Sequence, residues 1–283
     1  MRLPYRILNV FTVAGDRLSG DPLCVFEDGS ALSTAQMQAL ARQLNLSVTT
    51  FVLPSTVATA RVRIFTPGFE MPFAGHPTLG TAHVVRALRG GDAVTLEENV
   101  GIVPVTSDGD RWTLRAAKSP ATRAATATRT QLAQLIGVDE GAIGEPLWVD
   151  TGAEQLVIPL ATADDVRRAT PIAALFAQYA RGTHEEMAYV WARESAANGP
   201  DRIVVRFFFT QHGAVIEDPA TGSACANLGG YLLATGTVPP FAVTLSQGEA
   251  VGRPSLLGLR ISDDRGIYVS GNVVELGAGV FDV

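Results

Sequence analysis

Acidic and hydroxyl side chains gather in the stretch EDPATGSA, from Glu217 to Ala224. The residues that follow are mostly alanine, leucine and glycine, a composition that favours a buried helix. The first N–H groups of a helix have no partner within it, and with the helix dipole they bind anions. Asp218 adds a carboxylate suited to proton transfer, and Gly222 and Ser223 add N–H donors and a hydroxyl for an anionic ligand.

The same pattern occurs earlier in the chain. Residues 62–85 and 205–232 each contain a V-R-aromatic strand, a loop, the motif E-x-P-x-x-G and a helix. This repetition indicates an internal duplication and therefore a pair of pseudo-symmetric lobes. If the lobes face each other, two helix starts converge on one cleft that suits a small carboxylate. Gly75 and His76 occupy the first helix start, so His76 and Asp218 are the expected acid and base, one from each lobe.

The alternative to a ligand site is that the residues of these motifs have structural roles only. Asp218 would then cap a turn, and Thr221 would cap the helix that follows. Glu70 and Glu217, which occupy the same place in the two motifs, brace the turn as readily as they contact a ligand. His212 lies in the loop before the second motif and is a further candidate for the site.

Short strands rich in β-branched and aromatic residues dominate both halves of the chain. A helix is predicted over 33–44, with Ser33 as its cap, and another begins near Gly75. Further helices are predicted over 129–137 and over 170–180, the latter starting at a Thr-Pro pair.

The domain boundary is placed in the Ala/Thr/Arg-rich stretch 116–130, which has little pattern. The expected lobes are 1–118 and 119–283, with crossing of the chain between lobes allowed near the C-terminus. A chain of 283 residues with 47% hydrophobic composition can bury a sizeable core.

Charge and motif content exclude several classes of function. The net charge is −6 without a basic run, which argues against nucleic acid as a partner, and no long apolar run predicts a membrane span. Without a secretion signal, a cytoplasmic location is expected. Lys118 is the only lysine and lies in the presumed boundary, so a Schiff-base mechanism is disfavoured. Dinucleotide, P-loop and metal-ligand spacings are missing, and we expect neither cofactor nor metal.

These residues by themselves indicate a cofactor-free enzyme that acts on a small anionic molecule by proton transfer. A two-lobed binding protein would have a similar sequence.

Several long motifs resemble the PhzF family, which takes its name from a phenazine-biosynthesis isomerase. They are RIFTPGFEMPFAGHPTLGTAH, EDPATGSA, QGEAVGRPS, GDPLCVF and NLSVTTFV, and the resemblance covers essentially the whole chain. It implies an α+β fold similar to diaminopimelate epimerase, with two lobes that each wrap a barrel-like, mostly antiparallel sheet round a central helix. It also implies a site between the lobes, no cofactor and a homodimer.

The resemblance also assigns roles to single residues. Epimerases and proline racemases place cysteines before the two helix glycines, where this chain has Ala74 and Thr221, so two-thiol chemistry is not supported. PhzF isomerases use a glutamate in N-L-S-E-T-T-F as the proton shuttle, and Val48 stands at that position here. The assisting His, Asp and Ser match His76, Asp218 and Ser223.

A second departure concerns Asp21, which stands where the family commonly has the asparagine of G-N-P-L. One carboxylate is lost at position 48 and another is gained at position 21. We hypothesise that Asp21 takes over as acid or base. The alternative is that it caps the turn before Pro22.

The sequence therefore predicts a PhzF-like isomerase or tautomerase of biosynthetic secondary metabolism, acting on a small, cyclic, unsaturated amino or carboxylic acid. His76, Asp218 and Asp21 are the expected catalytic residues. The expected substrate-binding residues are Gly75, Gly222, Ser223, Thr221 and Val48. A non-catalytic ligand-binding protein, or a lyase or hydrolase that uses the same cleft, is the alternative.

Overall fold

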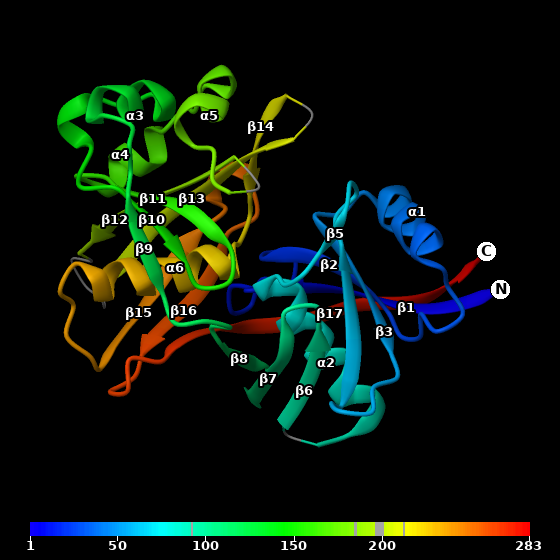
Figure 1. The fold of residues 1–283 in the computed structure, drawn as a ribbon. Helices are drawn as coiled ribbons and strands as arrows, with labels where there is room; N and C mark the ends of the chain where they lie inside the picture. Colours follow the sequence, from blue (N-terminus) through cyan, green and yellow to red (C-terminus); the bar gives the residue numbers. More distant parts are fainter. Residues whose placement is uncertain (92, 184–185, 196–200, 212) are drawn as a thin grey trace. The chain divides into compact units, whose positions relative to one another are not determined.

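Strands rich in β-branched and aromatic residues, together with two glycine-rich helices, organise the chain into two units (Figure 1). The computed structural model describes residues 1–91, 93–183, 186–195, 201–211 and 213–283. Unit 1 contains Met1–Ala117 and Val269–Val283, and unit 2 contains Lys118–Tyr268.

Unit 1 is a closed ring of strands. Following hydrogen-bonded neighbours, β1 leads through β2, β3, β4, β6, β7, β8 and β17 back to β1. The β2–β3 and β4–β6 pairs are parallel. The strands are β1 (Arg2–Val10), β2 (Asp21–Phe26), β3 (Val48–Leu53), β4 (Ala60–Phe65), β5 (Glu70–Met71), β6 (Ala93–Glu98), β7 (Gly101–Asp108), β8 (Arg111–Arg115) and β17 (Ile267–Asp282).

Helix α2 (Gly75–Arg89) is the central helix of unit 1 and contacts strands all round the ring, from β1 to β8 (Figure 1). Gly80 permits this close packing, because a Cβ atom there would lie 2.5 Å from Cδ2 of Leu23. Helix α1 (Thr34–Leu44) begins with the expected Ser33 cap and packs Met37 into a cluster with Phe26 and other aromatic residues.

Unit 2 repeats this architecture. Its sheet runs through β9, β10, β11, β12, β13, β15 and β16, with β11–β12 and β13–β15 parallel. The elements are β9 (Ala121–Ala124), α3 (Arg129–Ile136), η1 (Glu140–Ala142), β10 (Leu147–Asp150), β11 (Glu154–Pro159), α4 (Ala163–Arg168), α5 (Ala173–Tyr179), β12 (Met187–Glu194), β13 (Arg202–Gln211), β14 (Ala214–Asp218), α6 (Gly222–Ala234), β15 (Phe241–Gln247), η2 (Glu249–Val251) and β16 (Ser255–Ile261).

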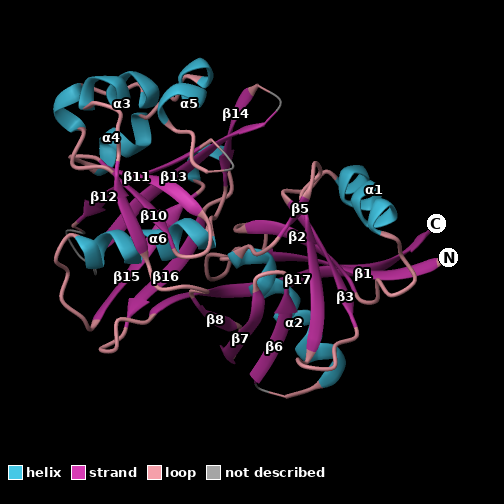
Figure 2. Ribbon diagram, viewed as in Figure 1, coloured by secondary structure: helices cyan, strands magenta, loops and turns pink. Residues whose placement is uncertain are grey.

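The duplicated connectivity confirms the expected fold class. In each unit an antiparallel hairpin, β4–β5 or β13–β14, leads into the central helix, and the next strand pairs in parallel with the first strand of the hairpin. Helix α6 contacts β9, β10, β11 and β16, as α2 contacts its own strands. Figure 2 shows strands dominating both units, with α3, α4 and α5 grouped on unit 2.

Two details differ from the sequence-based expectation. The stretch 116–130 contains strand β9, which pairs with β10. Val269–Val283 belongs to unit 1, a crossing near the C-terminus that the expectation allowed, because β17 pairs along β1. Helix α5 begins at Ala173 with no side-chain cap, so the predicted start at the Thr-Pro pair is wrong. No helix in the described part of the chain is long and apolar enough to cross a membrane.

Candidate active site

His76 and Asp21 form a buried side-chain pair in unit 1. His76 is the second residue of α2, and Asp21 is the first residue of β2. Nδ1 of His76 lies 3.1 Å from Oδ2 of Asp21, and Ser47 donates a hydrogen bond of 3.0 Å to Oδ1. At this distance Asp21 can orient the ring if the imidazole hydrogen is on Nδ1, because a carboxylate oxygen accepts hydrogen bonds.

The remaining ring nitrogen of His76 is available for proton transfer. Nε2 is buried and has no hydrogen-bond partner among the described residues. Burial lowers the pKa of His76 to about 3, so the imidazole is neutral at ordinary pH. In the tautomer with its hydrogen on Nδ1, a neutral imidazole presents the lone pair of Nε2 as a proton acceptor.

Val48 lies close to this pair along the sheet. It is the first residue of β3, it follows Ser47, and it pairs in parallel with Leu23 of β2. Its side chain is 5% exposed. The valine side chain at this position is apolar and cannot carry a proton.

Glu98 is a second buried acid of unit 1, and the sequence analysis missed it. It ends β6, and its Oε1 accepts a 2.7 Å hydrogen bond from the hydroxyl of Thr78 in α2. Burial raises the pKa of Glu98 to about 8, so the side chain is largely protonated at neutral pH. Glu98 lies on the same face of β6 as the buried Val94 and Leu96, so the alternation along this strand already places the acid inside.

Asp218 ends β14 in unit 2, just before α6. Its Oδ2 accepts a short hydrogen bond from the hydroxyl of Thr221. Burial, opposed by this hydrogen bond and assisted by the charge of Glu217, raises the pKa of Asp218 to about 6. Asp218 can therefore both release and accept a proton near neutral pH.

Thr221 does not cap α6 with its side chain. It occupies the N-cap position, but its hydroxyl makes no hydrogen bond to the helix backbone and is directed to Asp218 instead. The capping interpretation of Thr221 is therefore wrong. Ala74, at the equivalent N-cap of α2, also provides no side-chain cap.

Ser223 has a fixed hydroxyl oxygen. It accepts a 3.0 Å hydrogen bond from Nε2 of Gln155, whose Oε1 accepts from Asn227 at 2.8 Å. Since the oxygen already accepts, the hydroxyl hydrogen is left to donate to a ligand. Gly75 and Gly222 are buried first residues of α2 and α6, so their N–H groups lie among the orphan donors of the helix starts.

Glu70 and Glu217 brace the two turns. Glu70 accepts a 2.8 Å hydrogen bond from Nε of Arg63, and Glu217 accepts bonds of 3.1 and 2.6 Å from Nε and Nη2 of Arg206. Each arginine comes from the strand before its motif. Both glutamates are thus engaged in hydrogen bonds with arginine side chains. The further candidate His212 lies outside the described residues.

The two cysteines are unsuited to acid–base work. Burial raises the pKa of Cys24 to about 12 and that of Cys225 higher still, so both thiols stay protonated. Within the ranges that the structure describes, no three His, Cys, Asp or Glu side chains are grouped as metal ligands.

Comparisons with known proteins agree with this architecture. The family model described as phenazine biosynthesis-like protein matches residues 8–279. An uncharacterized isomerase of Pasteurella multocida is 36% identical over 279 residues, covering 97% of this chain and 92% of that protein. The trans-2,3-dihydro-3-hydroxyanthranilate isomerase of Pseudomonas chlororaphis is 32% identical, covering 97% and 98%.

Solved structures show the same fold. A PhzF-family phenazine biosynthesis protein of Bacillus anthracis superposes with a TM-score of 0.87 at 23% identity and covers both chains completely. This chain belongs to the phenazine biosynthesis-like (PhzF) protein family. The named relatives are isomerases, which supports isomerase activity at the level of the family.

Proposed function

We propose that this protein is a cofactor-independent isomerase or tautomerase that moves a proton on a small, cyclic, unsaturated amino or carboxylic acid. The observation that carries the proposal is the buried His76–Asp21 pair, in which a neutral imidazole keeps Nε2 for proton transfer. The name of the Pseudomonas chlororaphis relative supports the substrate class, since its substrate is a hydroxylated dihydro derivative of anthranilate.

Proton transfer needs one group that removes a proton and one that returns it. Nε2 of His76 removes a proton from a carbon next to the double bond, and the electrons shift along the conjugated system. Asp218, with its pKa raised to about 6, returns a proton at the other end of that system. The product is an isomer, and proton exchange with water returns His76 and Asp218 to their starting states, so no other reactant is consumed. The N–H groups of Gly75 and Gly222 and the hydroxyl of Ser223 are suited to the substrate carboxylate.

The missing glutamate defines the distinctive part of the proposal. With Val48 as apolar wall, Asp21 provides the carboxylate in unit 1, acting on His76 rather than shuttling the proton itself. We also expect a homodimer that works in cytoplasmic biosynthesis, which rests on the family alone.

Incubation with cyclic dihydro amino acids in D₂O, followed by NMR, tests the proposal. The panel includes trans-2,3-dihydro-3-hydroxyanthranilate. We expect deuterium at a ring carbon together with an isomerised product, and losses of about 10²-fold or more in His76→Gln and Asp218→Asn. His83→Gln is the matched control, because His83 lies on α2 but packs its ring against Trp112.

Other outcomes separate the alternatives. Binding without deuterium exchange would mean a non-catalytic ligand-binding protein. A product that has lost a group, or gained water, would mean a lyase or hydrolase. Full activity in His76→Gln would remove the imidazole from the mechanism.

A further inference from the structure

Gln247 ends β15 and begins the QGEAVGRPS motif, to which the proposed function gives no role. Its side chain is 1% exposed and makes three hydrogen bonds at the start of α6. Nε2 donates to the main-chain oxygen of Asp218 at 2.8 Å and to the hydroxyl oxygen of Thr221 at 3.0 Å. Oε1 accepts from the main-chain N–H of Thr221 at 3.3 Å.

These bonds fix the direction of the Thr221 hydroxyl. An amide nitrogen can only donate, so the Thr221 oxygen is the acceptor in its bond with Gln247. The single hydrogen of that hydroxyl is then left for Oδ2 of Asp218. Gln247 thus holds Asp218 twice, directly at the main chain and through Thr221 at the carboxyl group.

The residues next to Gln247 form a tight turn that restricts the position of its side-chain amide. Gly248 has a φ of 79°, and a Cβ atom there would lie 2.6 Å from the main-chain oxygen of Pro219. Only glycine allows this approach to the strand–helix turn. Ser246 donates a 3.0 Å hydrogen bond to Glu249, which closes the following turn.

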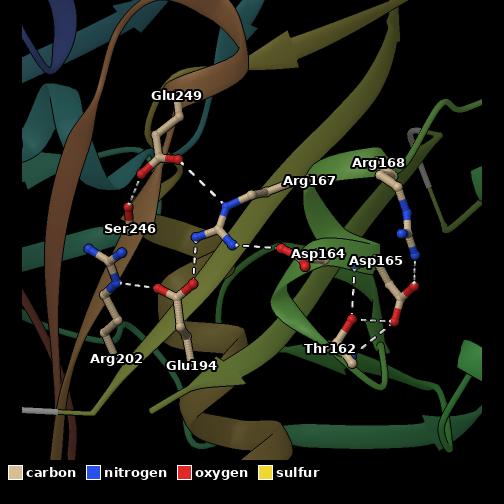
Figure 3. A network of polar contacts seen from close by, with 9 residues as sticks. All are labelled: Thr162, Asp164, Asp165, Arg167, Arg168, Glu194, Arg202, Ser246 and Glu249. Carbon is tan, nitrogen blue, oxygen red and sulfur yellow. Dashed lines mark hydrogen bonds and ion pairs between the residues drawn. The ribbon is translucent and has the colours of Figure 1, made fainter. Parts of the chain in front are cut away.

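Ion pairs tie the same turn to neighbouring elements (Figure 3). Nε of Arg167, in α4, lies 3.9 Å from Oε2 of Glu249, and Nη2 of Arg167 contacts Glu194 of β12 at 2.6 Å. Arg202 of β13 binds the other oxygen of Glu194. One ion pair, Glu249 with Arg167, therefore links the turn to α4, and Glu194 holds Arg167 from β12.

Unit 1 has a polar side chain at the equivalent position. In the parallel pairs, Leu245 lies opposite Ile203 and Leu96 lies opposite Ala60, so Gln247 and Glu98 each stand two residues further along. Glu98 bonds Thr78 near the start of α2, as Gln247 bonds Thr221 at the start of α6. In both units a polar side chain at the end of this strand thus holds the start of the central helix. In unit 2 the contact extends through Thr221 to the carboxyl group of Asp218.

We propose that Gln247 is a positioning residue that, through the Thr221 hydroxyl, sets the orientation and proton affinity of the Asp218 carboxyl group. The relevance of this link to turnover rests on the proposed function, whereas the link itself does not. The charge of Glu217 also raises the pKa of Asp218, and Glu217 is paired with Arg206 at 2.6 Å. The hydrogen bond from the Thr221 hydroxyl is the contact that lowers this pKa.

The titration of Asp218 tests the proposal directly. The carboxyl carbon is followed by ¹³C NMR from pH 4 to 9, with Asp218→Asn for assignment. Thr221→Val removes the donated hydrogen bond, and Gln247→Leu removes the amide that directs it. Both are expected to raise the titration midpoint by about half a pH unit or more, roughly a threefold fall in the acid constant.

Three comparisons make the result specific. Thr221→Ser keeps the hydroxyl and should restore the wild-type midpoint. Gln247→Leu should add little in a Thr221→Val background, since the two act through one link. Gln38→Leu, which removes an amide bonded to the Thr66 carbonyl in unit 1, should leave the midpoint unchanged.

The outcomes separate this proposal from the proposed function. An unchanged Asp218 midpoint in folded Thr221→Val overturns the link, whatever the activity, and this variant leaves the strand end intact. Shifted midpoints in a protein that catalyses no exchange would keep the link and reject the isomerase.

Discussion

Nδ1 of His76 and Oδ2 of Asp21 lie 3.1 Å apart at the meeting of α2 and β2, with both side chains buried. This relationship joins the two unusual features of the sequence motifs. In the proposed function, Asp21 does not itself shuttle the proton but acts on the imidazole of His76, and Nε2 faces the substrate.

Asp21→Asn should lower kcat by about 10²-fold or more with little change in KM, because an amide nitrogen cannot accept a hydrogen bond from Nδ1 and so can favour the other ring tautomer of His76. Deuterium exchange and turnover on the active member of the substrate panel measure this. Asp16→Asn, in an exposed loop, is the control. Unchanged turnover in Asp21→Asn would leave Asp21 with a local structural role only.

Glu98→Gln should make stability less dependent on pH. The folded protein keeps the Glu98 proton up to a pKa of about 8, whereas an unfolded glutamate loses it near pH 4.5. Between these values the native state binds more protons, so its stability falls as pH rises, by up to about 1.4 kcal/mol per pH unit.

Urea unfolding at pH 5 and pH 8 measures this dependence. The glutamine variant should gain stability relative to wild type as pH rises. Glu97→Gln, one residue earlier on β6 and paired with Arg61, is the matched control. An equal pH dependence in wild type and Glu98→Gln would mean that the acid is ionised in the folded state.

Glu217→Gln should reduce the free energy of unfolding by about 2 kcal/mol, because it weakens charged hydrogen bonds to Arg206 in a largely buried site. Asp282→Asn breaks the exposed pair with Arg2, where the side chains are 78% and 77% exposed, and should cost less than about 0.5 kcal/mol. Chemical denaturation of both variants makes the comparison. Equal costs would show that the brace contributes no more than a surface ion pair.

Gly248→Ala should destabilise the protein by about 2 kcal/mol or more, because the added Cβ meets main-chain oxygens as well as a left-handed backbone. Gly252→Ala is the control, since Gly252 has a similar φ of 68° but open space around the added atom. The difference between the two variants in urea isolates the contact with Pro219 and Arg253. If Gly252→Ala costs as much, backbone conformation alone explains the effect.

The sequence by itself determined the features that depend on local spacing. The two E-x-P-x-x-G motifs predicted two glycine-led helices and a duplicated chain, because turn and helix signals act over a few residues, and the family resemblance predicted the fold class. The sequence showed that a V-R strand precedes each motif. Only the structure shows that these arginines bind the glutamates of the motifs.

Tertiary structure decided which polar side chains meet. Asp21 reaches His76 and Gln247 reaches Thr221 because strands distant in sequence close round a central helix. The return of β17 to β1 likewise follows from strand pairing across nearly the whole chain. Such contacts are set by sheet register and helix packing, which no local pattern encodes.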